Sequence, residues 1–132
     1  MNYLVDTHTF LYVLFSSKKI TKKVRDILSD PQLTKMVSAI TFWEISLKYS
    51  LGKLDLIGIL PDKLPFVAKD SGFEILKLDA EIAASFYKLP KFGDKDPFDC
   101  MLAWQAISKD YYLLTQDQDF TDYKDYGLNV VW

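Results

Sequence analysis

The sequence predicts an α/β fold, a three-layer α/β/α sandwich with a central, mostly parallel sheet. Short apolar runs typical of buried strands alternate along the chain with longer segments whose apolar residues recur at helical spacing. Parallel strands need crossover connections and are covered on both faces, so this alternation is typical of a parallel sheet between two layers of helices. No repeat, linker or low-complexity tract interrupts the 132 residues. We therefore expect one domain over residues 1–132.

The expected strands are short, apolar and bounded by turn-forming or polar residues. They cover residues 3–5, 35–38, 74–78, 112–115 and 128–132. The expected helices cover residues 9–14, 20–28, 40–51, 64–69 and 80–89, with one more starting at about residue 96 and a turn or short helix at 116–120. Prolines and glycines mark several helix ends, among them Pro31, Gly52 and Pro90.

The composition narrows the class of any metal site. Cys100 is the one cysteine and His8 the one histidine, so disulfides, cysteine-based zinc sites and clusters of imidazole ligands are excluded. A metal would have to be held by carboxylates, which favours Mg²⁺ or Mn²⁺. The formal charge of −2 is unlike that of a strongly basic nucleic-acid coat protein. No apolar run approaches the ~20 residues that span a bilayer, so we expect a cytoplasmic protein without a membrane partner.

Four acidic residues fall at the expected strand ends or at the helix starts that follow them. They are Asp6, Glu44, Asp99 and Asp117. In a parallel sheet these positions converge on the edge formed by the carboxyl ends of the strands, which is where ligands bind in such folds. The four carboxylates are therefore candidates to meet around a cation. Four close carboxylates would repel one another, and one or two divalent ions would relieve that repulsion and activate a bound water.

The segment Asp96-Pro97-Phe98-Asp99 contains two acids with different surroundings. Asp96 suits a helix N-cap, and Pro97 suits the first helical position. Asp99 has apolar neighbours at three, four and seven residues further along the helix, namely Leu102, Ala103 and Ala106. A carboxylate that faces apolar side chains carries a desolvation cost unless a metal or a strong hydrogen-bond donor offsets it. We interpret Asp96 as the cap and Asp99 as a candidate metal ligand.

Each of the other acids also has a purely structural interpretation. Asp6 could cap the following helix, and Glu44 could complete a capping box begun by Thr41 or pair with Lys48 at i+4. Asp117 and Asp119 could be solvated turn residues, and for Asp119 this interpretation is favoured. His8 has no Gly-x-Ser-x-Gly elbow to serve, so a structural role is favoured for it.

Several segments of the chain resemble the PIN-domain ribonucleases, specifically the VapC-like toxins of type II toxin–antitoxin pairs. The resemblance extends over essentially the whole chain, in family order. It rests on Leu4-Val5-Asp6-Thr7-His8, Val37-Ser38-Ala39 with Trp43-Glu44-Ile45, Asp96-Pro97-Phe98-Asp99, Leu114-Thr115-Gln116-Asp117 and the closing Val130-Val131-Trp132.

The resemblance implies a PIN-like fold and an Mg²⁺- or Mn²⁺-dependent endoribonuclease that inhibits translation. It implies that the catalytic and metal-binding residues are Asp6, Glu44, Asp99 and Asp117. Thr7 and Thr115 are expected to hydrogen-bond the carboxylates or an ordered water, and Asp96 belongs to the local motif of one subgroup. The resemblance also implies an antitoxin protein that blocks the site, and a homodimer of the toxin.

Two further points stay open at the level of sequence. Lys91 and Lys95 precede the Asp99 helix, and we expect them to contact RNA phosphates, although a solvated loop explains them equally well. The competing function is a catalytically inactive PIN-like or receiver-like metal-binding regulatory module. Receivers usually carry adjacent acids after the first strand, whereas here Asp6 stands alone, and the intact quartet argues against an inactive domain.

Overall fold

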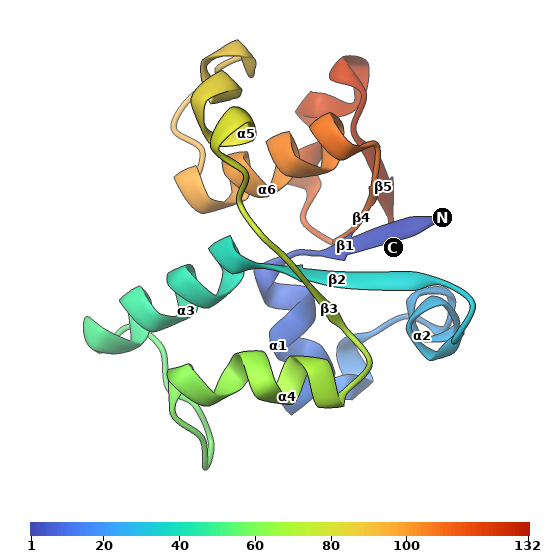
Figure 1. Ribbon diagram of the computed structural model, residues 1–132, viewed down its shortest axis with the longest axis vertical. Helices are drawn as coiled ribbons and strands as arrows, with labels where there is room; N and C mark the ends of the chain where they lie inside the picture. The colour runs from blue at the N-terminus through green and yellow to red at the C-terminus, as the bar shows by residue number, and fades with distance from the viewer.

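The computed structural model describes residues 1–132 and contains a single five-stranded sheet (Figure 1). The strand order is β3-β2-β1-β4-β5, and every neighbouring pair is parallel. The strands are β1 (Asn2–Val5), β2 (Thr34–Ser38), β3 (Glu74–Leu76), β4 (Tyr112–Leu114) and β5 (Asn129–Val131). The predicted parallel α/β sheet is thus confirmed.

The helical segments fill the connections between the strands. The α-helices are α1 (Thr7–Phe15), α2 (Lys22–Ser29), α3 (Ala39–Ser50), α4 (Leu64–Asp70), α5 (Ala80–Ser85) and α6 (Pro97–Lys109). The 3₁₀ segments are η1 (Ser17–Lys19), η2 (Pro61–Lys63), η3 (Phe86–Lys88) and η4 (Gln118–Tyr126). None of the helices combines the length and the hydropathy needed to cross a bilayer.

Two hydrophobic clusters of 11 buried residues each lie on opposite faces of the sheet. Successive residues of β1 point to opposite faces, so Val5 belongs to one cluster and Leu4 to the other. The first cluster is completed by side chains of α1, α2, α3 and α4, and the second mainly by side chains of α6 and η4. Figure 1 shows α1, α2 and α4 below the sheet and α5 and α6 above it, which confirms the three layers.

Most predicted boundaries shift by one or two residues, and three elements illustrate the differences. The strand expected at 74–78 ends at Leu76 because its partner β2 ends at Ser38, where the chain turns into α3 and leaves Lys77 without a neighbour. The helix expected at 80–89 divides into α5 and η3, and Pro90 follows directly, as is usual where a helix cannot continue. The short helix expected at 116–120 extends as η4 to Tyr126.

Strand ends in this fold double as helix caps. Asp6 follows β1 and caps α1 by accepting a hydrogen bond from the Thr9 N–H over 2.8 Å. Ser38 ends β2 and caps α3, so the capping box of Thr41 and Glu44, one of the two structural alternatives for Glu44, does not form. Asp96 caps α6 as predicted, with Pro97 in the first helical turn.

A buried side-chain amide connects α6 to the ends of two strands. Gln105 of α6 is fully buried, and its Oε1 accepts a hydrogen bond from Ser38 Oγ over 2.5 Å. Its Nε2 donates to the Lys77 carbonyl over 3.3 Å. One side chain of α6 therefore contacts both the end of β2 and the segment directly after β3.

Replacement of Leu113 tests how far the second cluster supports the sheet. Leu113 is central in β4 and fully buried, so Leu113→Ala should lower the free energy of unfolding by about 2–5 kcal/mol. Denaturant titration followed by circular dichroism measures the change. Leu60, which is 57% exposed, provides the control, and Leu60→Ala should stay within about 0.5 kcal/mol of the wild type. Equal effects of the two substitutions would contradict this description of the core.

Candidate active site

The register of the sheet brings three strand ends to the same level. Val5, the last residue of β1, is paired with Val37 of β2 and with Leu114, the last residue of β4. The residues that follow these strands, and the first turns of the helices behind them, therefore share one edge of the sheet (Figure 1). This is the edge at which the sequence predicts a convergence of carboxylates.

Asp6 is 2% exposed and holds two structural hydrogen bonds at once. Its Oδ1 caps α1 through the Thr9 N–H, and its Oδ2 accepts from Thr115 Oγ1 over 2.6 Å. Burial raises the pKa of the Asp6 carboxyl, and the hydrogen bonds from Thr115 and Thr9 act in the opposite direction. The capping role that the sequence offered as an alternative is therefore present, and it leaves Asp6 at the shared edge.

Glu44 is equally buried and is held by a hydroxyl and by an ammonium group. Thr7 Oγ1 donates to Glu44 Oε1 over 2.7 Å and lies 3.0 Å from Thr41 Oγ1. Lys48, one turn further along α3, donates to Glu44 Oε2 over 2.5 Å. Both structural alternatives proposed for Glu44 involve neighbours on its own helix, and the structure contains the pair with Lys48.

Asp99 differs from these two acids because its carboxylate has no hydrogen-bond partner in the protein. Its backbone N–H bonds Asp96 Oδ1 over 3.4 Å, and its side chain lies half-buried beside the fully buried Leu102 and Ala103. Burial first, and then the charges of four nearby acids, raise the pKa of Asp99 to about 8. Those acids are Asp96, Glu44, Asp6 and Asp117. The structure therefore brings the other three members of the predicted quartet within electrostatic reach of Asp99.

Asp117 is joined to Asp6 through a threonine. Thr115 Oγ1 accepts the Asp117 N–H over 3.0 Å while it donates to Asp6. Asp117 Oδ1 in turn caps η4 by accepting from the Asp119 N–H over 2.9 Å. Asp119 itself is exposed. Both predicted hydroxyls, Thr7 and Thr115, thus contact carboxylates, and their part in catalysis stays a prediction.

The donor atoms suit a hard divalent cation, but they are not closed around one. All four side chains offer carboxylate oxygens, the ligands that Mg²⁺ and Mn²⁺ prefer. No group of three or more His, Cys, Asp or Glu side chains is arranged so that it could hold a metal ion. Glu44 is turned to Lys48, and Asp6 accepts a hydrogen bond from Thr115. Cation binding would therefore require at least Glu44 to exchange its partner.

A cavity of about 250 Å³ opens beside Asp99. Its lining includes four acids and one lysine, Asp94, Asp96, Asp99, Asp119 and Lys95, together with Cys100, Phe120 and Tyr123. The Cys100 thiol lies 3.4 Å from the Tyr123 hydroxyl. Sequence reasoning did not identify Tyr123, because it belongs to η4 and only the tertiary fold brings it to α6.

The two lysines expected to contact RNA have different surroundings. The Lys95 ammonium donates to the Asp119 carbonyl over 3.0 Å and pairs with Asp122 at 2.8 Å, so it fastens the loop before α6 to η4. Lys91 is exposed, and its ammonium lies 4.5 Å from the centre of the Phe86 ring. Lys91 is therefore the freer of the two, and RNA contact remains a prediction for both.

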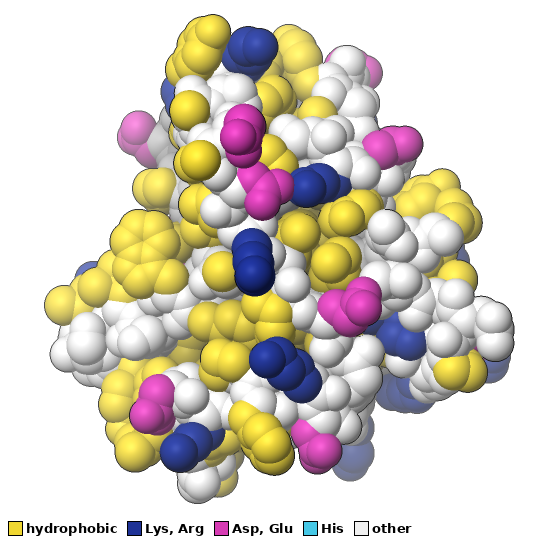
Figure 2. Space-filling view, in the orientation of Figure 1, with side chains coloured by type: hydrophobic (Ala, Val, Ile, Leu, Met, Phe, Trp, Pro, Cys, Tyr) yellow, Lys and Arg dark blue, Asp and Glu magenta, His cyan; other side chains and the backbone are white.

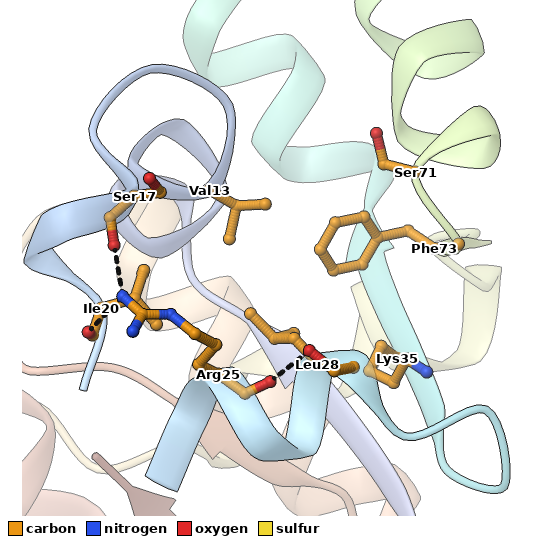
Figure 3. A pocket seen from close by; sticks show the side chains of 10 residues that line it. Val13, Ser17, Ile20, Arg25, Leu28, Lys35, Ser71 and Phe73 are labelled. Carbon is orange, nitrogen blue, oxygen red and sulfur yellow. Dashed lines mark hydrogen bonds between the residues drawn. The ribbon is translucent and has the colours of Figure 1, made fainter. Parts of the chain in front are cut away.

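A second cavity, of about 230 Å³, lies away from the acids (Figure 3). Figure 3 shows Val13 and Phe73 facing each other across it, with Arg25 to one side and Lys35 to the other. Lys35 lies near the start of β2, whereas the acids follow the strand ends. Arg25 bonds the carbonyls of Ser17 and Ile20, and Lys35 bonds the carbonyl of Asp30 over 2.6 Å. Both cations of this cavity are thus used within the fold.

The raised pKa of Asp99 makes the stability of the metal-free protein depend on pH. The folded protein retains a proton on Asp99 up to about pH 8, whereas the unfolded chain loses it near pH 4. This contribution to stability is present at low pH and is lost as the pH rises through about 8. Asp99→Asn should melt close to the wild type at pH 4 and about 5 °C or more above it at pH 9 in the presence of chelator. Asp55→Asn, at an exposed loop position, is the control, and a Tm gap for Asp99→Asn that does not grow with pH would contradict the electrostatic description.

Several solved structures are similar to this fold. One is VapBC2 from Rickettsia felis bound to a DNA fragment from its promoter, with a TM-score of 0.70 and 20% identity over 100% of this chain and 99% of that chain. VapBC-1 from nontypeable Haemophilus influenzae gives a TM-score of 0.69 and 18% identity over 99% and 97% of the two chains. FitAcB from Neisseria gonorrhoeae gives 0.66 and 21% over 98% and 96%. At these identities the similarity establishes the fold.

The sequence comparison identifies the family directly. A search among curated proteins found no match. Residues 3–126 match the family model described as PIN domain, and this range includes all four acids of the quartet. Because the match covers most of the chain, and the parallel sheet with its acidic edge agrees with it, the protein belongs to the PIN domain family.

Proposed function

We propose that this protein is a metal-dependent endoribonuclease and the toxin of a toxin–antitoxin pair. The observation that carries the proposal is the state of Asp99. It is a half-buried carboxylate without a hydrogen-bond partner, surrounded by the charges of four other acids at the ligand-binding edge of a parallel sheet. Such a carboxylate does not stabilise the fold, because each nearby like charge and each lost water molecule raises the free energy of its ionised form. Membership in the PIN domain family supports a nuclease.

The proposed site consists of Asp6, Glu44, Asp99 and Asp117, which would hold Mg²⁺ or Mn²⁺. When bound, such an ion lowers the pKa of a coordinated water and offsets negative charge on the phosphate. Thr7 and Thr115 hold the carboxylates of Glu44 and Asp6 in fixed orientations through bonds of 2.7 and 2.6 Å. Fixed orientation matters because displaced ligands lose much of the catalytic advantage of a preorganised site.

The substrate would approach the site along the loop that precedes α6. Lys91 is exposed there and is available to a phosphate, and Lys95 holds the loop in place through Asp122. Contacts of this type position a nucleic-acid backbone without reading its sequence. The cavity beside Asp99 lies between this loop and η4, so a scissile phosphate placed against Asp99 would have room for the adjacent nucleotide. An RNA-cleaving toxin would act in the cytoplasm and inhibit translation there.

The exposed surface of α3 supports the proposal of a protein partner. Trp43, Leu47 and Leu51 recur at i, i+4 and i+8, and their exposures are 60%, 37% and 58%. Figure 2 shows hydrophobic side chains along the left edge of the molecule, where α3 lies in Figure 1. Contiguous apolar surface of this kind marks interaction sites. Two of the similar structures are named VapBC2 and FitAcB. By analogy with the VapC-like toxins, we propose that this chain binds an antitoxin protein and forms a toxin homodimer.

A cleavage assay with matched variants tests the enzymatic proposal. Purified protein is incubated with total cellular RNA and Mg²⁺ or Mn²⁺, and the new ends are sequenced. The wild type should cleave and chelator should abolish cleavage. Asp99→Asn should reduce the rate by about 10²-fold or more, because a ligand of the metal is lost.

Asp119→Asn is the matched control for this assay. Asp119 lines the same cavity but is exposed and outside the quartet, so its replacement should leave the rate within about twofold of the wild type. Single-stranded DNA with the sequence of a mapped RNA cleavage site serves as the competing substrate. Cleavage that survives both chelator and Asp99→Asn, or cleavage of DNA alone, would overturn the proposal of a metal-dependent ribonuclease.

A further inference from the structure

Lys48 is the one cation that the structure places directly against the acidic quartet. Its ammonium pairs with Glu44 Oε2 at 2.5 Å and lies 3.8 Å from Asp96 Oδ2. The charges of Glu44, Asp96 and Asp99 all act on it. Lys48 therefore contacts one predicted metal ligand, approaches the cap of α6, and lies within electrostatic reach of a second ligand.

This pair differs from an ordinary surface pair at the same helical spacing. Lys22 and Asp26 also lie at i and i+4, with an N···O distance of 2.8 Å, but their side chains are 86% and 63% exposed. Glu44 is only 3% exposed, whereas Lys48 is 35% exposed. A solvated pair contributes little, but a buried carboxylate that loses its partner is costly. Glu44 therefore depends on a cation, and Lys48 supplies one from the solvent side.

The position of Lys48 also gives it a route away from Glu44. It is partly exposed on a flexible side chain, and Asp96 offers a second carboxylate at 3.8 Å, on the solvent side of the site. An ammonium that moves toward Asp96 would leave Glu44 Oε2 free while it stays paired with an acid. Glu44 would keep its other hydrogen bond, from Thr7 to Oε1.

We infer that Lys48 is a resident counter-ion that occupies the Glu44 side of the site and competes with the divalent cation for this carboxylate. The inference rests on the proposed function for the identity of the site. It goes further because it assigns the control of metal affinity to Lys48. In the metal-free protein Lys48 offsets the repulsion within the quartet, and it moves toward Asp96 when a divalent ion binds. The affinity for the metal is accordingly lower than the four carboxylates alone would give.

The test compares metal-free stability with metal affinity in the same variants. Lys48→Met removes the charge and keeps most of the apolar stem, Lys48→Arg keeps a charge, and Lys22→Met is the matched i,i+4 control. In chelator, Lys48→Met should lower the Tm by about 5 °C, and Lys22→Met should stay within about 1 °C. Binding of Mn²⁺, followed by loss of the EPR signal of the free ion, should be on the order of tenfold tighter in Lys48→Met than in the wild type. Lys48→Arg should restore most of the wild-type behaviour in both measurements.

The outcomes separate the inference from the proposed function. If Asp99→Asn weakens Mn²⁺ binding but Lys48→Met binds no more tightly than the wild type, the metal site stands and the role of Lys48 is overturned. If Lys48→Met lowers the Tm without tightening Mn²⁺ binding, Lys48 is a structural partner of Glu44 alone, which also overturns the inference. If Asp99→Asn does not weaken the binding of Mn²⁺, the proposed metal site and the inference fail together.

Discussion

The parallel pairing of β1 with both β2 and β4 is the constraint on which the rest of the site depends. Val5 is level with Val37 and Leu114. The chain therefore leaves the three strands at one edge, and the residues that follow the strands lie close together. The hydrophobic pattern fixes this register, since a slip of one residue would exchange the side chains of β1 between the two core clusters. The cost of burying apolar side chains in the wrong layer thus also determines where Asp6 and the start of α3 lie.

Acids that meet at such an edge repel one another, and the fold offsets this with local interactions. Asp6 and Asp117 cap the segments that follow them, and Thr115 bridges the two. Glu44 has a hydroxyl and an ammonium group. Asp99 alone has neither, and its carboxyl pKa rises to about 8 in consequence. Structural and candidate functional roles are therefore not alternatives for these residues. The same carboxylate can cap a helix with one oxygen while its second oxygen makes a different contact, as Asp6 does with Thr115.

The sequence predicted the features that depend on local patterns. The parallel sheet, the three layers and the capping of α6 by Asp96 follow from apolar periodicity and from the chemistry of helix ends. The end of β3 at Leu76 did not, because it is set by where the neighbouring strand stops. The capping box considered at Thr41 does not form, because Ser38 caps α3 through the Ile40 N–H, and its hydroxyl also donates to Gln105, a residue 67 positions away. The i+4 spacing offered the pair of Glu44 with Lys48, whereas the approach of Lys48 to within 3.8 Å of Asp96 depends on the tertiary fold.

The amide of Gln105 has a consequence for how the chain tolerates changes in length. It contacts both Ser38 and Lys77 and so fixes the position of α6 along its axis, six residues after Asp99. An inserted or deleted residue in the exposed loop before α6 would therefore be absorbed by the loop rather than passed on as a shift of the helix. The composition of the loop can change, and under the proposed function the nucleic acid that it contacts changes with it, while Lys95 keeps the loop fastened to η4 and the carboxylate of Asp99 stays at the same depth in the site. The surface of this loop and the position of the Asp99 carboxylate are in this sense separately adjustable in one short stretch of chain.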